Sequence, residues 1–591
     1  MTEAFIICLI VIAIAILVYY LFFRMKKGLK SIIIFAFIVC LIATSILVYP
    51  LLKYDNSFTR GFASFIYSTK CISLSQDLDV LSNISLESLF GYIYFGLINI
   101  FFIAVPGLTA GIIVSFVDHI VTYIKLRIFK NKKICVFSEL NDKSLIVAKN
   151  LEKECTIVFA NIEEKKGIDV KSIKTNKNVF DIKFSPKSDI TFYMIYEDEE
   201  RSLNESLELI NKYKENNNIK IYVVNRNPST PLILDSMDKG NVIVEIINEN
   251  ERLIFNLLNN KPLFLNTVNK TISILIAGCG CIGQEFLRDA IWCGMVPGYE
   301  LKILVVDLIA DEIKEHLDID NPELLENYNI SFIKGDIKSD KVIKKIKETG
   351  DINYVLISLG NDDKNIDTGV MLRKLFIRDI NSEPIINVFT NNQYKQDQIT
   401  KLQNEKGNSY NLNGFGSISE LYKQYTKDGS ELEKLAIKVH LGYDPSDKEL
   451  KRYNLREYNK RSSRSCAVHI KYKFFAILGD KYANNMKENQ RLFREIYSNK
   501  IEELLARNEH DRWMAYMRSI GYMKVDTDKV MSYFEKNKHY IDYLSRRHPG
   551  LVSYDELDKV SKELSNITSQ NINLRESDKK IVELLNKKID L

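Results

Sequence analysis

The stretch Ile274-Leu-Ile-Ala-Gly-Cys-Gly-Cys-Ile-Gly-Gln-Glu-Phe-Leu287 lies near the middle of this 591-residue chain. An apolar run ends in Gly278-x-Gly280-x-x-Gly283, and a helical pattern follows. Gly278 permits a tight turn, Gly280 lets the backbone approach a pyrophosphate, and Gly283 lets the helix pack close to the strand. The helix N-terminus then offers free N–H groups to an anion. The stretch therefore predicts a strand, a phosphate-binding turn and a helix.

The residues after this turn repeat the alternation of strand and helix. Apolar runs occur at 272–277, 301–306, 330–333, 354–358 and 385–389. Asp307 ends the second run, about 20 residues past the glycines, where a ribose-binding carboxylate is expected. Asp336 follows the third run. Because strand ends of such a sheet share its ligand-binding edge, we expect a doubly wound nucleotide-binding domain over 270–395.

The preceding segment has the same pattern without the glycines. Apolar runs occur at 133–138, 156–160, 190–196, 219–224 and 242–247, separated by helical patterns. The first turn, 138–142, reads Ser-Glu-Leu-Asn-Asp, in which Asn141 and Asp142 can cap a helix. We expect a degenerate Rossmann-like domain over 132–262. Because its first turn has no glycines, the backbone of this turn cannot approach a dinucleotide in the usual way. The domain is therefore expected to be structural or to bind a different ligand.

The N-terminal region, 1–128, predicts three membrane-spanning helices, at about 4–23, 31–52 and 88–121. Basic residues gather at 24–30 and 125–133, which predicts an external N-terminus, an external loop over 53–87 and cytoplasmic C-terminal domains in a multi-pass protein of the cell membrane. Pro106, Gly107 and Gly111 interrupt the third span. They predict either a hinge in a pore-lining helix or an ordinary kink in a tilted anchor helix.

A helical C-terminal domain is expected over 431–591, after a polar linker at 396–430. Glu509, Arg512, Trp513 and Tyr516 have helical spacing and share one face. An acid, a guanidinium, an indole and a phenol together can hold a base and a phosphate. The alternative is an internal ion pair between Glu509 and Arg512 beside a core Trp513.

A basic cluster precedes this face in the sequence. It comprises Arg461, Arg464, His469 and Lys473, of which the last two are four residues apart and share a helix face. One interpretation is a phosphate pocket that the cluster shares with Arg512. The other is a solvated basic surface.

Composition narrows the classes of partner. The net charge is +5, and nine of the basic residues flank the apolar stretches, so that acidic residues slightly outnumber basic ones elsewhere. A broad footprint for a nucleic acid polymer is therefore excluded. The nine cysteines include no pair with zinc spacing, so we expect free thiols and no metal site.

Membrane helices, a basic connector and two nucleotide folds together resemble the TrkA-N or RCK family of potassium-transport regulators. The resemblance covers 132–392 and implies that the domains bind nucleotides and act on a pore or transporter. Carried over to the glycine turn, it implies that Gly278, Gly280, Cys281, Ile282 and Gly283 contact NAD(H) or another adenine nucleotide. Asp307 would contact the same ligand, and Asp336 would lie near its base.

The C-terminal region contains Glu509-His-Asp-Arg-Trp513, then Gly521-Tyr522, then His548-Pro-Gly-Leu-Val-Ser-Tyr554-Asp-Glu-Leu557. These motifs resemble the RyR domain, the repeat named after ryanodine receptors, over 431–591. The resemblance implies a bacterial membrane protein that senses nucleotide-derived messengers in ion transport or phage defence. It assigns ligand binding to Arg464, His469, Lys473 and the helix face 509–516.

These patterns together predict a ligand-gated, homo-oligomeric membrane protein, either channel-like or a membrane effector, that a small nucleotide controls. We do not expect an enzyme, because the segment 307–392 contains no Tyr-x-x-x-Lys pair beside the expected cofactor site. Two alternatives are a membrane-anchored NAD(P)-dependent oxidoreductase and a regulatory subunit of a potassium transporter.

Overall fold

The computed structural model describes residues 29–73, 75, 78–127, 133–162, 169–185, 187–404, 410–423, 430–442 and 446–587. The first expected span, 4–23, lies outside these residues. The chain divides into two compact units, Met1–Lys130 with Lys183–Pro186 and Asn131–Ile182 with Lys187–Leu591. We call them the helical unit and the sheet unit.

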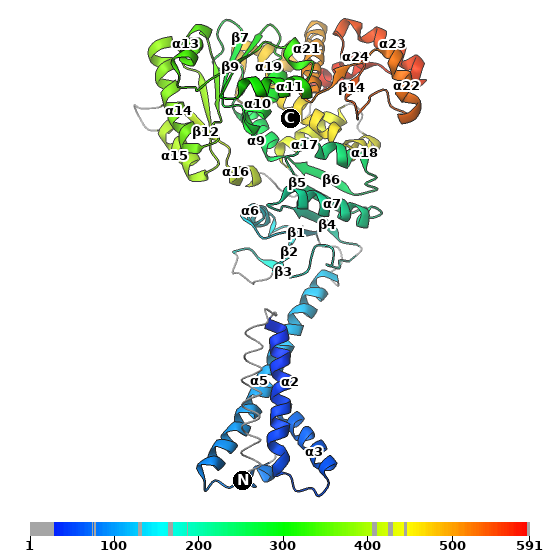
Figure 1. Cartoon of the computed structure of the whole chain (residues 1–591). Helices are drawn as coiled ribbons and strands as arrows, with labels where there is room; N and C mark the ends of the chain where they lie inside the picture. The colour runs from blue at the N-terminus through cyan, green and yellow to red at the C-terminus, as the bar shows by residue number, and fades with distance from the viewer. Residues whose placement is uncertain are drawn as a thin grey trace. The chain divides into compact units, whose positions relative to one another are not determined.

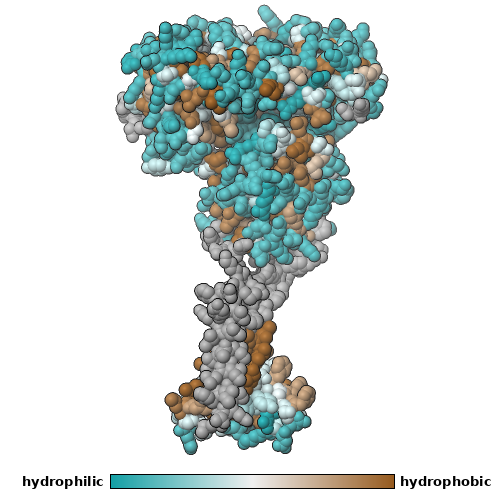
Figure 2. Space-filling model, in the orientation of Figure 1, coloured by the Kyte–Doolittle hydropathy of each residue, from teal (hydrophilic) through white to brown (hydrophobic). Residues whose placement is uncertain are grey.

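The helical unit contains two long apolar helices, α2 (Leu29–Val48) and α5 (Leu89–Arg127), which pack along each other. Between them come η1 (Tyr49–Leu51), α3 (Ser57–Lys70), η2 (Cys71–Ser73) and α4 (Leu78–Leu81). Leu47 and Tyr94 are buried at the contact, and the Tyr94 hydroxyl donates a hydrogen bond to the Leu47 carbonyl. Figure 2 shows apolar side chains on the outside of this unit, where Ile100 and Ile103 of α5 are more than half exposed.

Within the described residues, one helical stretch, Leu89–Ile113, is long and apolar enough to cross a membrane by length and composition. Ala36–Leu51 is a shorter apolar helix. The three-span arrangement and its orientation therefore stay predictions. Pro106 lies inside α5, and the helix continues through it to Arg127, so the hinge at Pro106, Gly107 and Gly111 also stays a prediction.

The first sheet of the sheet unit is parallel, with the order β3-β2-β1-β4-β5-β6 (Figure 1). Its strands are β1 (Lys133–Phe137), β2 (Thr156–Phe159), β3 (Ser172–Lys174), β4 (Asp189–Met194), β5 (Ile219–Val224) and β6 (Ile243–Ile247). Its helices are α6 (Asp142–Leu151), α7 (Glu199–Tyr213), α8 (Thr230–Ser236) and α9 (Glu249–Asn260). Asn141 caps α6 in a capping box with Ser144, which is the structural role expected for that turn.

The second sheet is also parallel and has the equivalent order β12-β11-β10-β7-β8-β9. Its strands are β7 (Thr271–Ala277), β8 (Glu300–Asp307), β9 (Ile330–Lys334), β10 (Tyr354–Ile357), β11 (Ile385–Phe389) and β12 (Leu412–Phe415). The helices between them are α10 (Cys281–Cys293), α11 (Ala310–Asp320), α12 (Leu324–Asn327), α13 (Asp340–Thr349), α14 (Asp362–Leu375), η3 (Phe376–Ile380) and α15 (Gln393–Asn404). Both sheets have the strand order of a doubly wound dinucleotide fold, so the expected tandem Rossmann-like architecture is confirmed.

Residues 396–430, expected to be a linker, contain a strand of the second sheet and a helix that packs against the first sheet domain. β12 pairs with β11 and completes the second sheet. α16 (Ile418–Lys423) then packs against α6 of the first domain. The Asn150 side chain donates to the Lys423 carbonyl over 3.1 Å, and the Tyr422 hydroxyl donates to Glu249 over 2.8 Å. The segment therefore connects the second fold back to the first.

The C-terminal region is helical, as expected. Its helices are α17 (Glu431–Leu441), α18 (Asp447–Leu455), α19 (Glu457–Leu478), α20 (Met486–Ile496), α21 (Asn499–Ser519), α22 (Thr527–Asn537), α23 (Leu557–Thr568) and α24 (Leu574–Asn586), with short turns η4 (Gly479–Lys481) and η5 (Tyr554–Glu556). Two short strands, β13 (Met523–Lys524) and β14 (Arg547–His548), pair in parallel. We call this region the C-terminal helical domain; whether it is an RyR domain stays a prediction.

Candidate nucleotide-binding site

The glycine turn between β7 and α10 has the backbone geometry that the sequence predicts. Gly278 has φ of +89°, and a Cβ there would lie 2.5 Å from the Ser358 carbonyl oxygen. A Cβ on Gly283 would lie 2.3 Å from the Gly278 carbonyl oxygen. A Cβ on Gly280 would meet nothing within 4 Å. The turn is thus tight at both ends and open at Gly280, where a pyrophosphate is expected to approach.

The N-terminus of α10 faces the same opening. Gly280 is its N-cap and supplies no side-chain acceptor, so the first N–H groups of the helix are available to a ligand. Cys281 is exposed and Ile282 is buried. Cys281 is therefore exposed beside the glycine turn, whereas Ile282 packs into the core and holds the start of the helix in place.

The two predicted carboxylates occupy different places. Asp307 ends β8, and its carboxylate accepts hydrogen bonds from the Cys279 N–H over 2.7 Å and from the Ile309 N–H over 3.0 Å. It is therefore oriented toward the glycine turn. Asp336 is exposed and accepts from the Lys338 N–H in its own turn after β9. Ligand contact with Asp307 and with Asp336 stays a prediction.

The switch in strand order falls between β7 and β10, so the turns after these strands border one crevice. Ser358 lies in the turn after β10, and its hydroxyl donates to the Gly278 carbonyl over 2.8 Å. Gly360, with φ of +79°, has open space where a Cβ would be. The glycine turn, Asp307 and the turn that contains Gly360 therefore lie along the same edge of the sheet.

One cationic residue near the glycine turn, Arg226, was not predicted from the sequence. Arg226 follows β5 of the first sheet domain and lies close enough to Cys281 for an electrostatic interaction. Burial lowers the pKa of Arg226, but the charge of Glu199 and its hydrogen bond to Arg226 outweigh this effect, so the pKa is raised overall. No local motif marks Arg226, because its position near the turn depends on how the two sheet domains pack.

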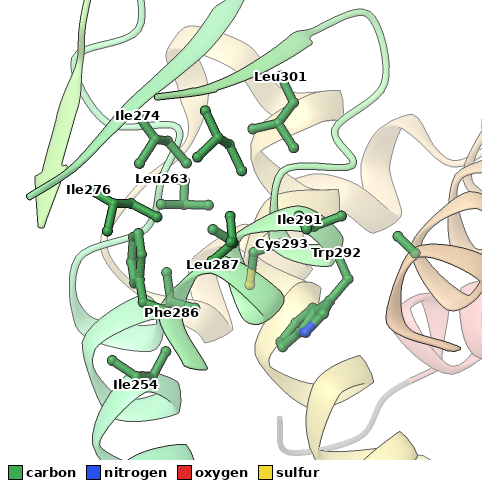
Figure 3. Close-up of a cluster of buried hydrophobic side chains, with 14 of the residues drawn as sticks. Ile254, Leu263, Ile274, Ile276, Phe286, Leu287, Ile291, Trp292, Cys293 and Leu301 are labelled. Carbon is green, nitrogen blue, oxygen red and sulfur yellow. The ribbon is translucent and has the colours of Figure 1, made fainter. Parts of the chain in front are cut away.

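The helix that begins at the glycine turn is buried on almost every side. Figure 3 shows Phe286, Leu287 and Ile291 of α10 beside Ile274 and Ile276 of the sheet. The opposite face of α10 packs against α19 and α21 of the C-terminal helical domain. Trp292 contacts Tyr516 edge to face, with ring centroids 6.4 Å apart. The helix at the nucleotide site and the C-terminal helical domain therefore share one core.

The predicted helix face of α21 is internal in the structure. Arg512 makes two hydrogen bonds to the Glu509 carboxylate, of 3.0 and 2.8 Å, and a third to the Ser465 hydroxyl. Lys473 lies 2.6 Å from the same carboxylate. Glu509, Arg512 and Tyr516 are almost completely buried, and Trp513 is half-buried. The arrangement contains the internal ion pair of the second alternative, but Glu509, Arg512 and Trp513 also line a cavity of about 340 Å³. Ligand binding at this helix face therefore stays a prediction.

The expected basic cluster is divided between two buried networks. Arg464 pairs with Glu433 over 2.7 Å and with Glu457 over 2.6 Å. Lys473 pairs with Glu509 and contacts the His469 ring nitrogen over 2.9 Å. Burial, and then the charges of Lys473 and Arg512, lower the pKa of His469. A phosphate pocket shared by these cations is thus not formed here, because buried cations require carboxylate partners.

Comparison with known proteins adds a similarity of low degree. No protein-family model matches the chain. No curated protein matches it either. Solved structures of the GsuK channel do match: one is 13% identical and covers 66% of this chain and 95% of its own, with a TM-score of 0.33. A structure of GsuK bound to ADP is 14% identical over 67% of this chain and 97% of its own, with a TM-score of 0.31. The GsuK channel bound to NAD is 12% identical over 66% of this chain and 81% of its own, with a TM-score of 0.32. At such TM-scores, we base the function on this chain's own residues.

Proposed function

We propose that this chain is a nucleotide-regulated membrane protein in which an adenine nucleotide binds at the glycine turn 278–283. The observation that carries the proposal is the geometry at Gly280: open space on its Cβ side, at the N-terminus of α10, on the carboxyl edge of a doubly wound sheet. The backbone N–H groups of α10 would bind the phosphates, and Asp307 would bind a ribose hydroxyl.

Transmission from this site has a physical route inside the sheet unit. α10 is packed between the sheet and the helices α19 and α21. A ligand that binds one arrangement of α10 more tightly than another would shift the arrangement of the C-terminal helical domain by that difference in affinity. We propose that such a shift controls a membrane activity of the helical unit, in ion transport or in phage defence, in a homo-oligomer.

The experiment uses the full chain purified in detergent, with calorimetric titration of NAD and ADP, the compounds named for the neighbouring GsuK structures. Gly280→Asp is the decisive variant. Its φ of −70° suits any residue, and its side chain would fill the open space with a negative charge. We expect at least about a 100-fold loss of affinity, since about 2.7 kcal/mol corresponds to two factors of ten. Equal binding by the wild type and Gly280→Asp would overturn the proposal.

The membrane activity needs a second measurement. The chain is reconstituted into liposomes loaded with potassium or with a dye, and release is followed with and without the nucleotide that binds. Nucleotide-dependent release that disappears in Gly280→Asp is the expected result. If none of the nucleotides causes release, the result would contradict a channel and favour a regulatory subunit of a transporter. Turnover of NAD(P)H that Gly280→Asp abolishes would instead favour the oxidoreductase alternative.

A further inference from the structure

A cavity of about 320 Å³ lies inside the sheet unit, between α8 of the first sheet domain and the C-terminal helical domain. We call it the tyrosine cavity. Its lining residues all come from outside the glycine turn. The ones that decide its chemistry are Arg456, Tyr458, Arg461, Tyr516, Tyr522 and Tyr543.

Aromatic rings form much of its wall. The Tyr458 ring centroid lies 5.9 Å from that of Tyr522 and 5.4 Å from that of Tyr543. The Arg456 guanidinium lies over the Tyr543 ring, 4.3 Å from its centroid. Such faces favour a flat ring, because nucleic-acid bases stack on aromatic and guanidinium planes in comparable sites.

Two residues that line this cavity each have a buried polar atom without a hydrogen-bond partner among the described residues: the Tyr516 hydroxyl and Nε of Arg461. Tyr516 is only 2% exposed, so its hydroxyl is deprived of bulk water as well. Leaving a buried donor unsatisfied destabilises the fold. A ligand that accepts from both atoms would recover that free energy.

The acidic residues of the lining are already engaged elsewhere. The Asp235 carboxylate accepts from the backbone N–H groups of Glu457 and Tyr458, at the start of α19, and pairs with Lys239. The Asp542 carboxylate accepts from backbone N–H groups of its own turn, at Leu544 and Ser545. A terminal nitrogen of Arg461 pairs with Glu251 over 2.9 Å, whereas its Nε and the Tyr516 hydroxyl stay unsatisfied. The lining residues therefore have unsatisfied donors while the carboxylates of the lining are occupied, which favours an anion.

We propose that the tyrosine cavity binds a second small ligand, a flat aromatic ring that carries one anionic group. The ring would stack on Tyr458, Tyr522 or Tyr543, and the anion would accept from Arg461 and the Tyr516 hydroxyl. A nucleoside monophosphate has this chemistry and serves as the probe. The site does not depend on the nucleotide proposed at Gly280.

The test uses the full-length Gly280→Asp chain in detergent, so that the glycine turn does not contribute. Each of the four common ribonucleoside monophosphates, adenosine and inorganic phosphate is titrated calorimetrically up to about 5 mM, well above common ligand affinities. We expect at least one monophosphate to bind about tenfold more tightly than adenosine or phosphate, because the ring and the anion contribute together. Failure of all four monophosphates to bind would overturn the proposal.

Matched variants assign the binding to the cavity. Ser236 lines the cavity, whereas Ile233 lies on the same short helix without lining it. Both side chains are exposed. Ser236→Trp should reduce binding at least about tenfold, or 1.4 kcal/mol, and Ile233→Trp should leave it unchanged. Tyr516→Phe removes only the hydroxyl and should weaken binding about three- to tenfold. Equal effects of the two tryptophan variants would place the ligand elsewhere and contradict the proposal.

Discussion

At the residue scale, the three glycines of the turn 278–283 have different physical roles. Gly278 has a left-handed backbone, Gly283 lies against the Gly278 carbonyl, and Gly280 faces open space. Only the first two are needed for folding. Gly280 is thus the position at which the ligand can be removed without changing the fold.

Gly283→Ala should destabilise the sheet unit, because its Cβ would lie 2.3 Å from the Gly278 carbonyl oxygen. We expect a cost of about 1–3 kcal/mol, as for other overpacked sites. Gly280→Ala is the control and should cost less than about 1 kcal/mol. Apparent melting temperatures of the two variants measure the difference. Equal melting temperatures would show that the turn has more freedom than this geometry allows.

The buried carboxylate of Glu509 predicts a dependence of stability on pH. Burial would raise its pKa, but Arg512 and Lys473 lower the pKa of Glu509 to about 2. The unfolded value is about 4.3, so the ionised pair stabilises the fold fully above that pH and progressively less as pH falls toward 2.

Glu509→Gln should therefore cost about 3–5 kcal/mol at neutral pH, because it leaves Arg512 and Lys473 buried beside a neutral group. The difference in melting temperature from the wild type should narrow below about pH 4. Glu535→Gln, at an exposed position of α22, is the control. If the difference in melting temperature between Glu509→Gln and the wild type does not change with pH, the assigned role of Glu509 is contradicted.

At the scale of elements, β12 and α16 show how a polar segment joins two domains. The Arg373 side chain of α14, 2% exposed, donates to the carbonyls of Pro384, Tyr410 and Asn411. The last two of these lie immediately before β12. One buried guanidinium thus positions the edge strand of the second sheet.

Arg373→Leu should loosen this edge, since each hydrogen bond to a charged group contributes about 1.5–3 kcal/mol. We expect faster amide hydrogen exchange in peptides that cover 410–416, measured by mass spectrometry. Arg378→Leu is the control, because Arg378 is exposed and pairs only with the neighbouring Asp379 in the described structure. Unchanged exchange at 410–416 in Arg373→Leu would mean that β11 alone holds the strand.

At the scale of the whole molecule, the sheet unit links its two candidate ligand sites through charges. Arg461 lines the tyrosine cavity and pairs with Glu251 of α9 over 2.9 Å. It also favours the ionised form of Glu285 on α10, the helix that begins at the glycine turn. Arg461 therefore connects the lining of the tyrosine cavity with α9 and α10 by charge.

The orientation of the membrane region can be tested on intact cells. Asp79, in the expected external loop, and Asp311, on α11, are both exposed. Asp79→Cys should react with a membrane-impermeant maleimide in intact cells, and Asp311→Cys only after lysis, relative to the unmodified chain with its own cysteines. Labelling of Asp311→Cys in intact cells would reverse the orientation predicted from the basic residues.

The sequence by itself determined the tandem parallel sheets and the glycine turn, because apolar strand runs and a short glycine motif are local patterns. It did not reveal β12, whose Leu-Asn-Gly-Phe sequence becomes a strand only through pairing with β11. Only the tertiary structure decided which partners the side chains of Arg464, Lys473, Glu509 and Arg512 pair with. Their spacing is equally compatible with a ligand face and an internal network. The choice depends on which distant carboxylates and helices cover them, as Glu433, Glu457 and α10 do here.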